Sequence, residues 1–160
     1  MDEDLDFSFA PSEIIYGARA IKLDPVTQGN CYLGSQNSMC VGVTPQQSQS
    51  APGMIGNNSY PYALAIPQSN SAYPYSPGGT GDEVPVYGPG RRCLIDIDPN
   101  FAGRIAPNDL VICSDSGLGK KASPFGPWNQ WVIGIALSFA NGGQSCNIKV
   151  WIFPWSPTGS

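Results

Sequence analysis

The sequence contains no histidine, and this absence limits the chemistry that its other residues could do. Histidine is the commonest general base and zinc ligand, and Ser-His and Cys-His nucleophile pairs need it. Asp96 and Asp98 stand two residues apart, so on a strand they would share a face and could act as paired carboxylates. The run Asp-Ile-Asp-Pro-Asn is, however, more typical of a strand that ends in an Asp-capped turn. We therefore expect no catalytic residues and a protein that is not an enzyme.

Five cysteines are the other reactive side chains, and their spacing favours no metal or disulfide framework. The number is odd, there is no Cys-x-x-Cys pair, and a zinc site would need four of them to converge from distant positions. We expect small buried thiols on strands, with no metal and no cofactor. These residues are Cys31, Cys40, Cys93, Cys113 and Cys146.

Length and composition favour one all-β domain. A chain of 160 residues buries one sizeable core, and its 19 Gly and 16 Pro leave few windows long enough for a helix. Charged residues make up only 12% of the chain. The sequence predicts a compact β-barrel or β-sandwich of short antiparallel strands.

The charge distribution argues against nucleic-acid and membrane partners. Asp2, Glu3, Asp4 and Asp6 carry the whole net charge of -4, and the other eight acids balance eight bases. The acidic start is the opposite of a signal peptide, and no apolar run of membrane-spanning length follows. We expect a soluble protein made in the cytoplasm.

The chain divides into an N-terminal arm over residues 1–13, a β domain over 14–153 and a C-terminal tail over 154–160. In the arm, apolar and polar residues alternate, so it could add as a strand to a partner, and its removal (residues 2–10) should leave the fold intact. A frayed arm is the open alternative. The tail, which begins at Pro154, is not expected to continue a central strand.

A long Tyr- and Pro-rich loop over residues 45–82 interrupts the β domain. Loops of this length are functional or packed on a partner, although a flexible surface loop stays an alternative. The residues expected to contact partners, from arm, loop and tail, are Leu5, Phe7, Phe9, Tyr60, Tyr62, Tyr73, Tyr75 and Trp155.

Turn residues divide the rest of the chain into short strands. The expected ranges are 14–23 with a bend at Gly17, 31–33, 39–43, 62–66, 83–87, 91–97, 109–114, 118–122, 131–139 and 146–153. A weak repeat relates residues 17–43 to 107–136. In each half a strand, a turn and a short second strand precede a strand with Gly at its centre, Val-Gly-Val at 41–43 and Ile-Gly-Ile at 133–135. A Gly inside a strand commonly marks close approach of a neighbouring backbone.

This pattern resembles the small β-barrel capsid decoration, or cement, proteins of tailed bacteriophages. The matching residues are Asp109-Leu110-Val111, Gly117, Ile133-Gly134-Ile135-Ala136, Gly142-Gly143 and Ile148-Lys149-Val150. The resemblance covers residues 83–152, and 14–45 loosely, and Asn108 stands where Gly often precedes the Asp.

The resemblance implies a homotrimer on the outside of a virion capsid, where it would clamp adjacent subunits of the major capsid protein. The alternative is a carbohydrate-binding β-sandwich module, for example in a head fibre, with Trp128, Trp131 or Trp151 stacking on sugar rings. Against this alternative, Trp131 and Trp151 lie within apolar strands, where Trp is more often core or interface.

Overall fold

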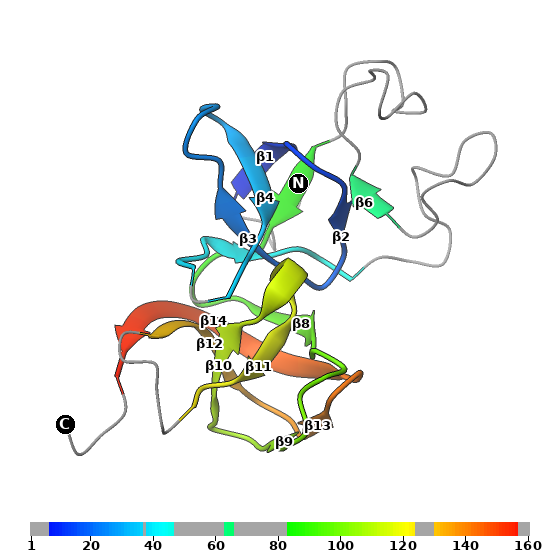
Figure 1. Cartoon of the computed structure of the whole chain (residues 1–160), viewed down its shortest axis with the longest axis vertical. Coiled ribbons are helices and arrows are strands. Elements are labelled where there is room, and N and C mark those ends of the chain that lie inside the picture. Colours follow the sequence, from blue (N-terminus) through cyan, green and yellow to red (C-terminus); the bar gives the residue numbers. More distant parts are fainter. Residues whose placement is uncertain (1–6, 37, 47–62, 66–82, 124–129, 157–160) are drawn as a thin grey trace.

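The computed structural model describes residues 7–36, 38–46, 63–65, 83–123 and 130–156. Regular structure in these residues is β, apart from the 3-10 turn η2 (Asp115–Gly117) (Figure 1). The predicted all-β fold is confirmed. The strands are β1 (Phe7–Pro11), β2 (Ile15–Tyr16), β3 (Ala20–Leu23), β4 (Asn30–Leu33), β5 (Gly42–Val43), β6 (Ala63–Ala65), β7 (Val84–Val86), β8 (Arg92–Asp96), β9 (Arg104–Ile105), β10 (Leu110–Cys113), β11 (Gly119–Lys121), β12 (Gln130–Ala136), β13 (Ala140–Asn141) and β14 (Ser145–Trp155).

The first sheet has the order β5-β3-β4-β1-β7 and closes on itself. Val43 of β5 and Tyr87, the residue after β7, form an antiparallel bridge. Each donates its N–H to the other's carbonyl, at 3.1 and 2.8 Å. The ring that results, here called the first barrel, encloses a core of Ile15, Ile21, Cys31, Leu33, Ala65, Val84 and Val86.

The second sheet, with the order β11-β10-β12-β14-β8, closes in the same way. Ile97, the residue after β8, bridges Gly119 of β11 in parallel, and Asp98 N–H donates to the Gly119 carbonyl at 2.9 Å. This ring is the second barrel. Its core is larger and is built mainly from Ile95, Ile97, Ile105, Val111, Cys113, Ile133, Ala136, Ala140, Cys146, Ile148 and Val150.

The two barrels are fused. Figure 1 shows the first barrel above and the second below. Ala20, Cys40 and Val43 of the first barrel belong to the core cluster of the second. Backbone bonds cross the junction, from Gly117 N–H to the Gly34 carbonyl at 2.8 Å and from Asp96 N–H to the Ala18 carbonyl at 2.8 Å. Shared core and shared hydrogen bonds make the pair one unit.

The predicted repeat is present in the strand pairing. β3 lies between β4 and β5, and β10 lies between β11 and β12 in the same arrangement. Gly42 pairs with Ile21 as Gly134 pairs with Val111. A Cβ at Gly42 would clash with the Tyr87 carbonyl, and one at Gly134 would lie 2.8 Å from the Lys149 carbonyl. The close backbone approach predicted for these two glycines is confirmed.

The N-terminal arm is a correction to the sequence prediction. Residues 7–11 form β1, which pairs with β4 in parallel and with β7 in antiparallel orientation. The alternating Phe7 and Phe9 therefore meet the chain's own barrel, which cannot close between β4 and β7 without this strand. The expectation of purely antiparallel strands is also wrong for this pair. Deleting residues 2–10 would remove most of β1, so we now expect this deletion to disrupt the first barrel rather than leave the fold intact.

The C-terminal strand extends further than predicted, because β14 continues through Pro154 to Trp155. Its pairing with β8 ends at Lys149, whereas its pairing with β12 runs to Trp155. Pro154 therefore lies where the described ladder has a partner on one side only, a position that tolerates a missing N–H. Two other predicted strands differ from the structure. Ala18, with φ of 55°, lies between β2 and β3 and divides the strand expected over residues 14–23. The strand expected over residues 131–139 ends earlier, at Ala136.

The junction predicts a large effect of a methyl group at Gly117. This residue has φ of +75°, and a Cβ there would clash with the Ala20 carbonyl of the first barrel. Gly117→Ala should lower the free energy of unfolding by about 3 kcal/mol, because backbone strain and the clash act together. Gly29, with φ of +84° and open space around it, is the matched control. Gly29→Ala should cost about 1 kcal/mol. Equal losses in urea unfolding would contradict this account.

Candidate functional site

An apolar groove lies between the barrels and contains two of the predicted contact residues, Phe7 and Phe9. Its volume is about 470 Å³. The rings of Phe7 and Phe9 lie 6.2 Å apart at an interplanar angle of 32°. The second barrel also lines the groove, through Ile152 on β14. The lining residues are Phe7, Phe9, Leu23, Met39, Cys40, Val41, Pro89 and Ile152.

Large apolar side chains at the rim of the groove are open to solvent. Phe7 is 44% exposed, Leu23 is 48% exposed and Met39 is 54% exposed. Apolar side chains gathered in one hollow are typical of a contact surface. Sequence reasoning missed Leu23 and Met39, because each stands in a stretch that reads as an ordinary buried strand. Leu23 turns outward at the end of β3, next to the exposed turn over residues 25–29.

The side chain of Trp155 packs against other residues of its own chain. It packs, together with Phe153 and Leu110, on a cluster of Ile112, Ala122 and Val132. Half-buried in this position, it contributes to the second barrel rather than to the groove. The other predicted contact residues, Leu5, Tyr60, Tyr62, Tyr73 and Tyr75, lie outside the described residues.

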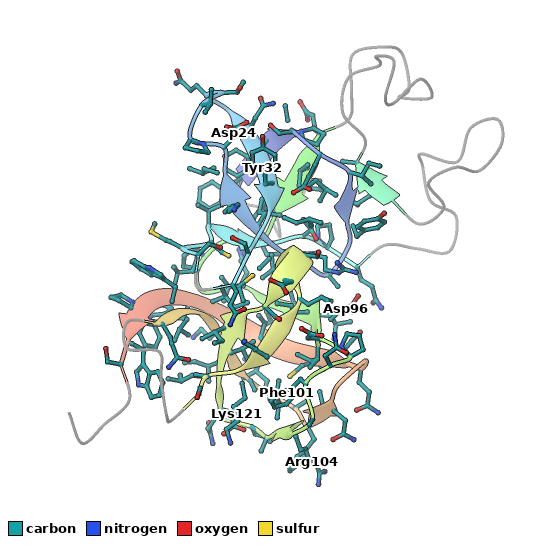
Figure 2. All side chains as sticks on the ribbon, in the orientation of Figure 1. Asp24, Tyr32, Asp96, Phe101, Arg104 and Lys121 are labelled. Atoms are coloured by element: carbon teal, nitrogen blue, oxygen red, sulfur yellow. The ribbon has the colours of Figure 1, made fainter. Side chains whose placement is uncertain are left out.

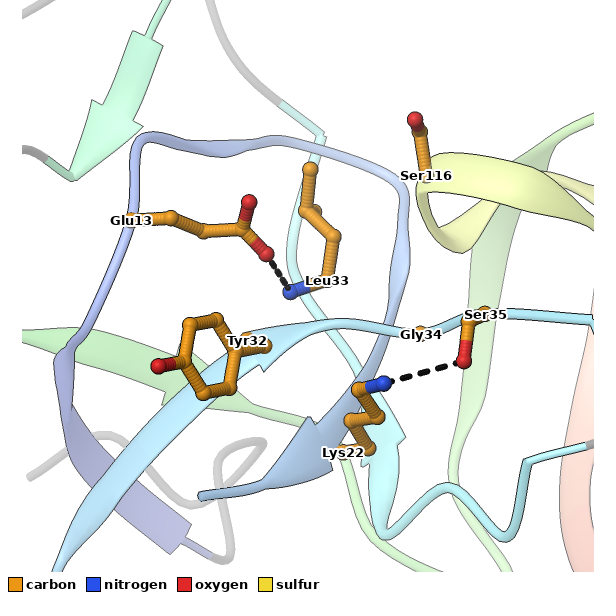
Figure 3. Close-up of a pocket in the computed structure, with 7 residues that line it drawn as sticks. All are labelled: Glu13, Lys22, Tyr32, Leu33, Gly34, Ser35 and Ser116. Carbon is orange, nitrogen blue, oxygen red and sulfur yellow. Dashed lines mark hydrogen bonds between the residues drawn. The ribbon is translucent and has the colours of Figure 1, made fainter. Parts of the chain in front are cut away.

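A second, polar pocket of about 320 Å³ opens on the first barrel near η2 (Figure 3). Lys22 Nζ donates to Ser35 Oγ at 2.9 Å, and Glu13 Oε2 accepts from the Leu33 N–H at 2.8 Å. A Ser-Lys pair is the nucleophile and base of some hydrolases. In this pocket the Lys amine donates to the hydroxyl, and the Ser35 N–H that an oxyanion would need donates to Ser38 Oγ at 3.0 Å. We therefore assign these groups to holding the loop after β4.

The paired aspartates hold the backbone in place. Asp98 Oδ1 accepts from the Asn100 N–H at 2.8 Å, and its Oδ2 accepts from Ser114 Oγ at 2.5 Å. Asp96, which Figure 2 shows near the level where the barrels meet, accepts from Ser145 Oγ at 2.7 Å. The hydrogen bonds from Ser114 and Asn100 lower the pKa of Asp98 below its ordinary value. The prediction of an Asp-capped turn at 98–100 is confirmed.

The cysteines are free thiols, four of them buried and Cys93 partly buried. Burial raises the pKa of Cys31 and of Cys93 to about 12, and the charge of Glu13 adds to the effect at Cys31. Among the described residues, no three His, Cys, Asp or Glu side chains gather as a metal ion would require. No helix in the described part of the chain has the length and apolar character needed to cross a membrane.

The lowered pKa of Asp98 predicts an acid-sensitive turn. A carboxyl with a depressed folded-state pKa stabilises the fold above its unfolded pKa, near 3.8, and this stability is lost as the pH falls further. Asp98→Asn should therefore flatten the decline in melting temperature between pH 5 and pH 2. Asp115→Asn, which removes the same charge at an exposed position of η2, is the matched control. If both variants decline in parallel with the wild type, Asp98 does not contribute to acid sensitivity.

Comparison with known proteins gives a structural likeness only. No protein-family model matches the sequence, and no curated protein matches it. Among solved structures, the fold is similar to the crystal structure of the head fibre gp8.5 N base of bacteriophage phi29. The TM-score is 0.50 at 12% sequence identity, and the alignment covers 91% of this chain and 92% of that chain. The likeness therefore extends over both barrels and shows a shared fold.

Proposed function

We propose that this chain is a nonenzymatic structural protein of a phage head, which binds the outside of the capsid as a homotrimer and stabilises contacts between major capsid protein subunits. The observation that carries the proposal is the fold shared with a phage head fibre base over nine tenths of both chains. Fold alone does not determine function, so the proposal also needs a surface suited to attachment.

The apolar groove is that surface. Phe7, Leu23 and Met39 expose large apolar side chains there, and burying such groups against a partner is favourable. In the sequence, Asp6 stands directly before Phe7, and three further acidic residues precede Asp6. A segment of the major capsid protein with apolar residues beside Lys or Arg matches this combination, because apolar burial gives affinity and opposite charge gives orientation. β1 already has partners on both edges, so the contact is made by side chains rather than by strand addition.

Binding to heads tests the groove. A Phe7→Ser, Leu23→Ser double variant should bind at least tenfold more weakly to purified heads that lack the protein, measured by co-sedimentation. Val26→Ser is the matched control, because Val26 is 89% exposed and lies outside the groove. Equal binding by the double variant and the wild type would exclude the groove as the attachment surface.

The oligomeric state is tested separately. Light scattering of the purified protein should give three times the 17.0 kDa mass of the chain. Three simultaneous attachments would multiply the affinity of each one. A monomer at high concentration would contradict the homotrimer while leaving the groove prediction standing.

Carbohydrate binding is the second candidate, and Trp151 is the observation that favours it. Its side chain is 49% exposed on the outer face of β14, where it could stack on a sugar ring. Trp131 is half-buried, and Trp128 lies outside the described residues. Binding of the wild type to a glycan array, together with loss of this binding in Trp151→Ala, would support this function over capsid attachment.

A further inference from the structure

Two buried thiols meet where the barrels join. Cys40 precedes β5 of the first barrel and Cys113 ends β10 of the second, and both are fully buried. A Cβ built on Gly34 would lie 2.6 Å from Cys113 Sγ and 2.8 Å from Cys40 Sγ. The missing side chain at Gly34 therefore leaves the space that both sulfurs share.

The two thiols are not equivalent. The hydrogen bond with Cys113 lowers the pKa of Cys40, with help from a hydrogen bond to Ser38 and from the charge of Lys22, whereas burial opposes the shift. The same bond and burial raise the pKa of Cys113. Cys40 lines the apolar groove and Cys113 is not among the lining residues, so an oxidant that enters from the groove meets Cys40 first.

The surroundings of Cys40 restrict which oxidant can reach it. Cys40 lies at the floor of the apolar groove, but none of its surface is open to solvent. A bulky disulfide such as oxidised glutathione does not fit such a site. Hydrogen peroxide is neutral and little larger than water, so its size and charge suit this enclosed apolar position.

We propose that Cys40 and Cys113 form an oxidation site at which hydrogen peroxide produces a disulfide between the two barrels. The Cys40 sulfur attacks one peroxide oxygen and the O–O bond breaks, which gives a sulfenic acid and, after proton transfer, one water. The Cys113 sulfur then attacks the Cys40 sulfur, and the S–O bond breaks as the hydroxyl leaves with the Cys113 proton as a second water. Two thiols are oxidised and one peroxide is reduced to two waters. This inference does not depend on the proposed function.

The expected consequence is a covalent link across the junction. The bond closes a long loop that contains β5 to β10, so it restricts the unfolded chain more than the folded one. The melting temperature should rise by about 5 °C on oxidation and return to its starting value with dithiothreitol.

Peptide mapping tests the site directly. Folded wild-type protein is treated with hydrogen peroxide, and catalase then stops the reaction. The protein is denatured and its remaining thiols are alkylated. It is then digested with a protease that cuts after Tyr32 or Leu33, because this cut separates Cys31 from Cys40. The expected product is one cross-linked peptide pair that contains Cys40 and Cys113, with the other three thiols alkylated.

Variants separate the pair from general oxidation. Cys113→Ala should give no cross-link and should accumulate a Cys40 sulfenic acid that dimedone traps. Cys146→Ala removes another buried thiol, one that donates a hydrogen bond to the Ser138 carbonyl, and should leave the cross-link unchanged. If Cys113→Ala does not fold, the wild-type peptide map decides alone. Five alkylated thiols after peroxide, or a disulfide between any other pair, would overturn the proposal.

Discussion

The structure depends on close approach of backbone and sulfur atoms at positions where a side chain is missing. Gly34 leaves space for two thiols, Gly42 for the Tyr87 carbonyl and Gly117 for the Ala20 carbonyl. Each contact lies where the first barrel closes or where it meets the second. Van der Waals contact and hydrogen bonding both fall steeply with distance, so a single methyl group at any of these positions separates the surfaces. The high glycine content is thus partly a requirement of barrel fusion, and not only of turns.

Much of the fold could be predicted from the sequence because strand punctuation is local. Gly, Pro, Asn and Asp bound the strands, and the Gly-centred strands at 41–43 and 133–135 indicated both the repeat and its close contacts. Ring closure could not be predicted in this way. It rests on single bridges, such as that between Ile97 and Gly119, whose partners are far apart in the chain and carry no distinctive residue type.

The residues of the groove could likewise be predicted from the sequence only in part. Phe7 and Phe9 were predicted as contact residues because they alternate with polar residues beside an acidic start, and they line the groove. The prediction was wrong about the element, since pattern alone does not distinguish a strand that awaits a partner from one that completes its own barrel. Leu23 and Met39 could not be predicted, because their exposure follows from how two barrels meet rather than from their neighbours in the sequence.

The position of the terminal strands has a mechanical consequence. β1 lies between β4 and β7, and β14 lies between β12 and β8 over its first half. The N-terminal end of the described chain therefore cannot be peeled away as an outer strand, whereas β14 has a strand partner on one side only from Trp151 to Trp155. A force that pulls on β1 must shear two ladders at once, so tension applied at the N-terminal end meets its resistance inside the first barrel, where hydrogen bonds share the load. The same force on Trp155 first separates β14 from β12 alone, one residue pair after another.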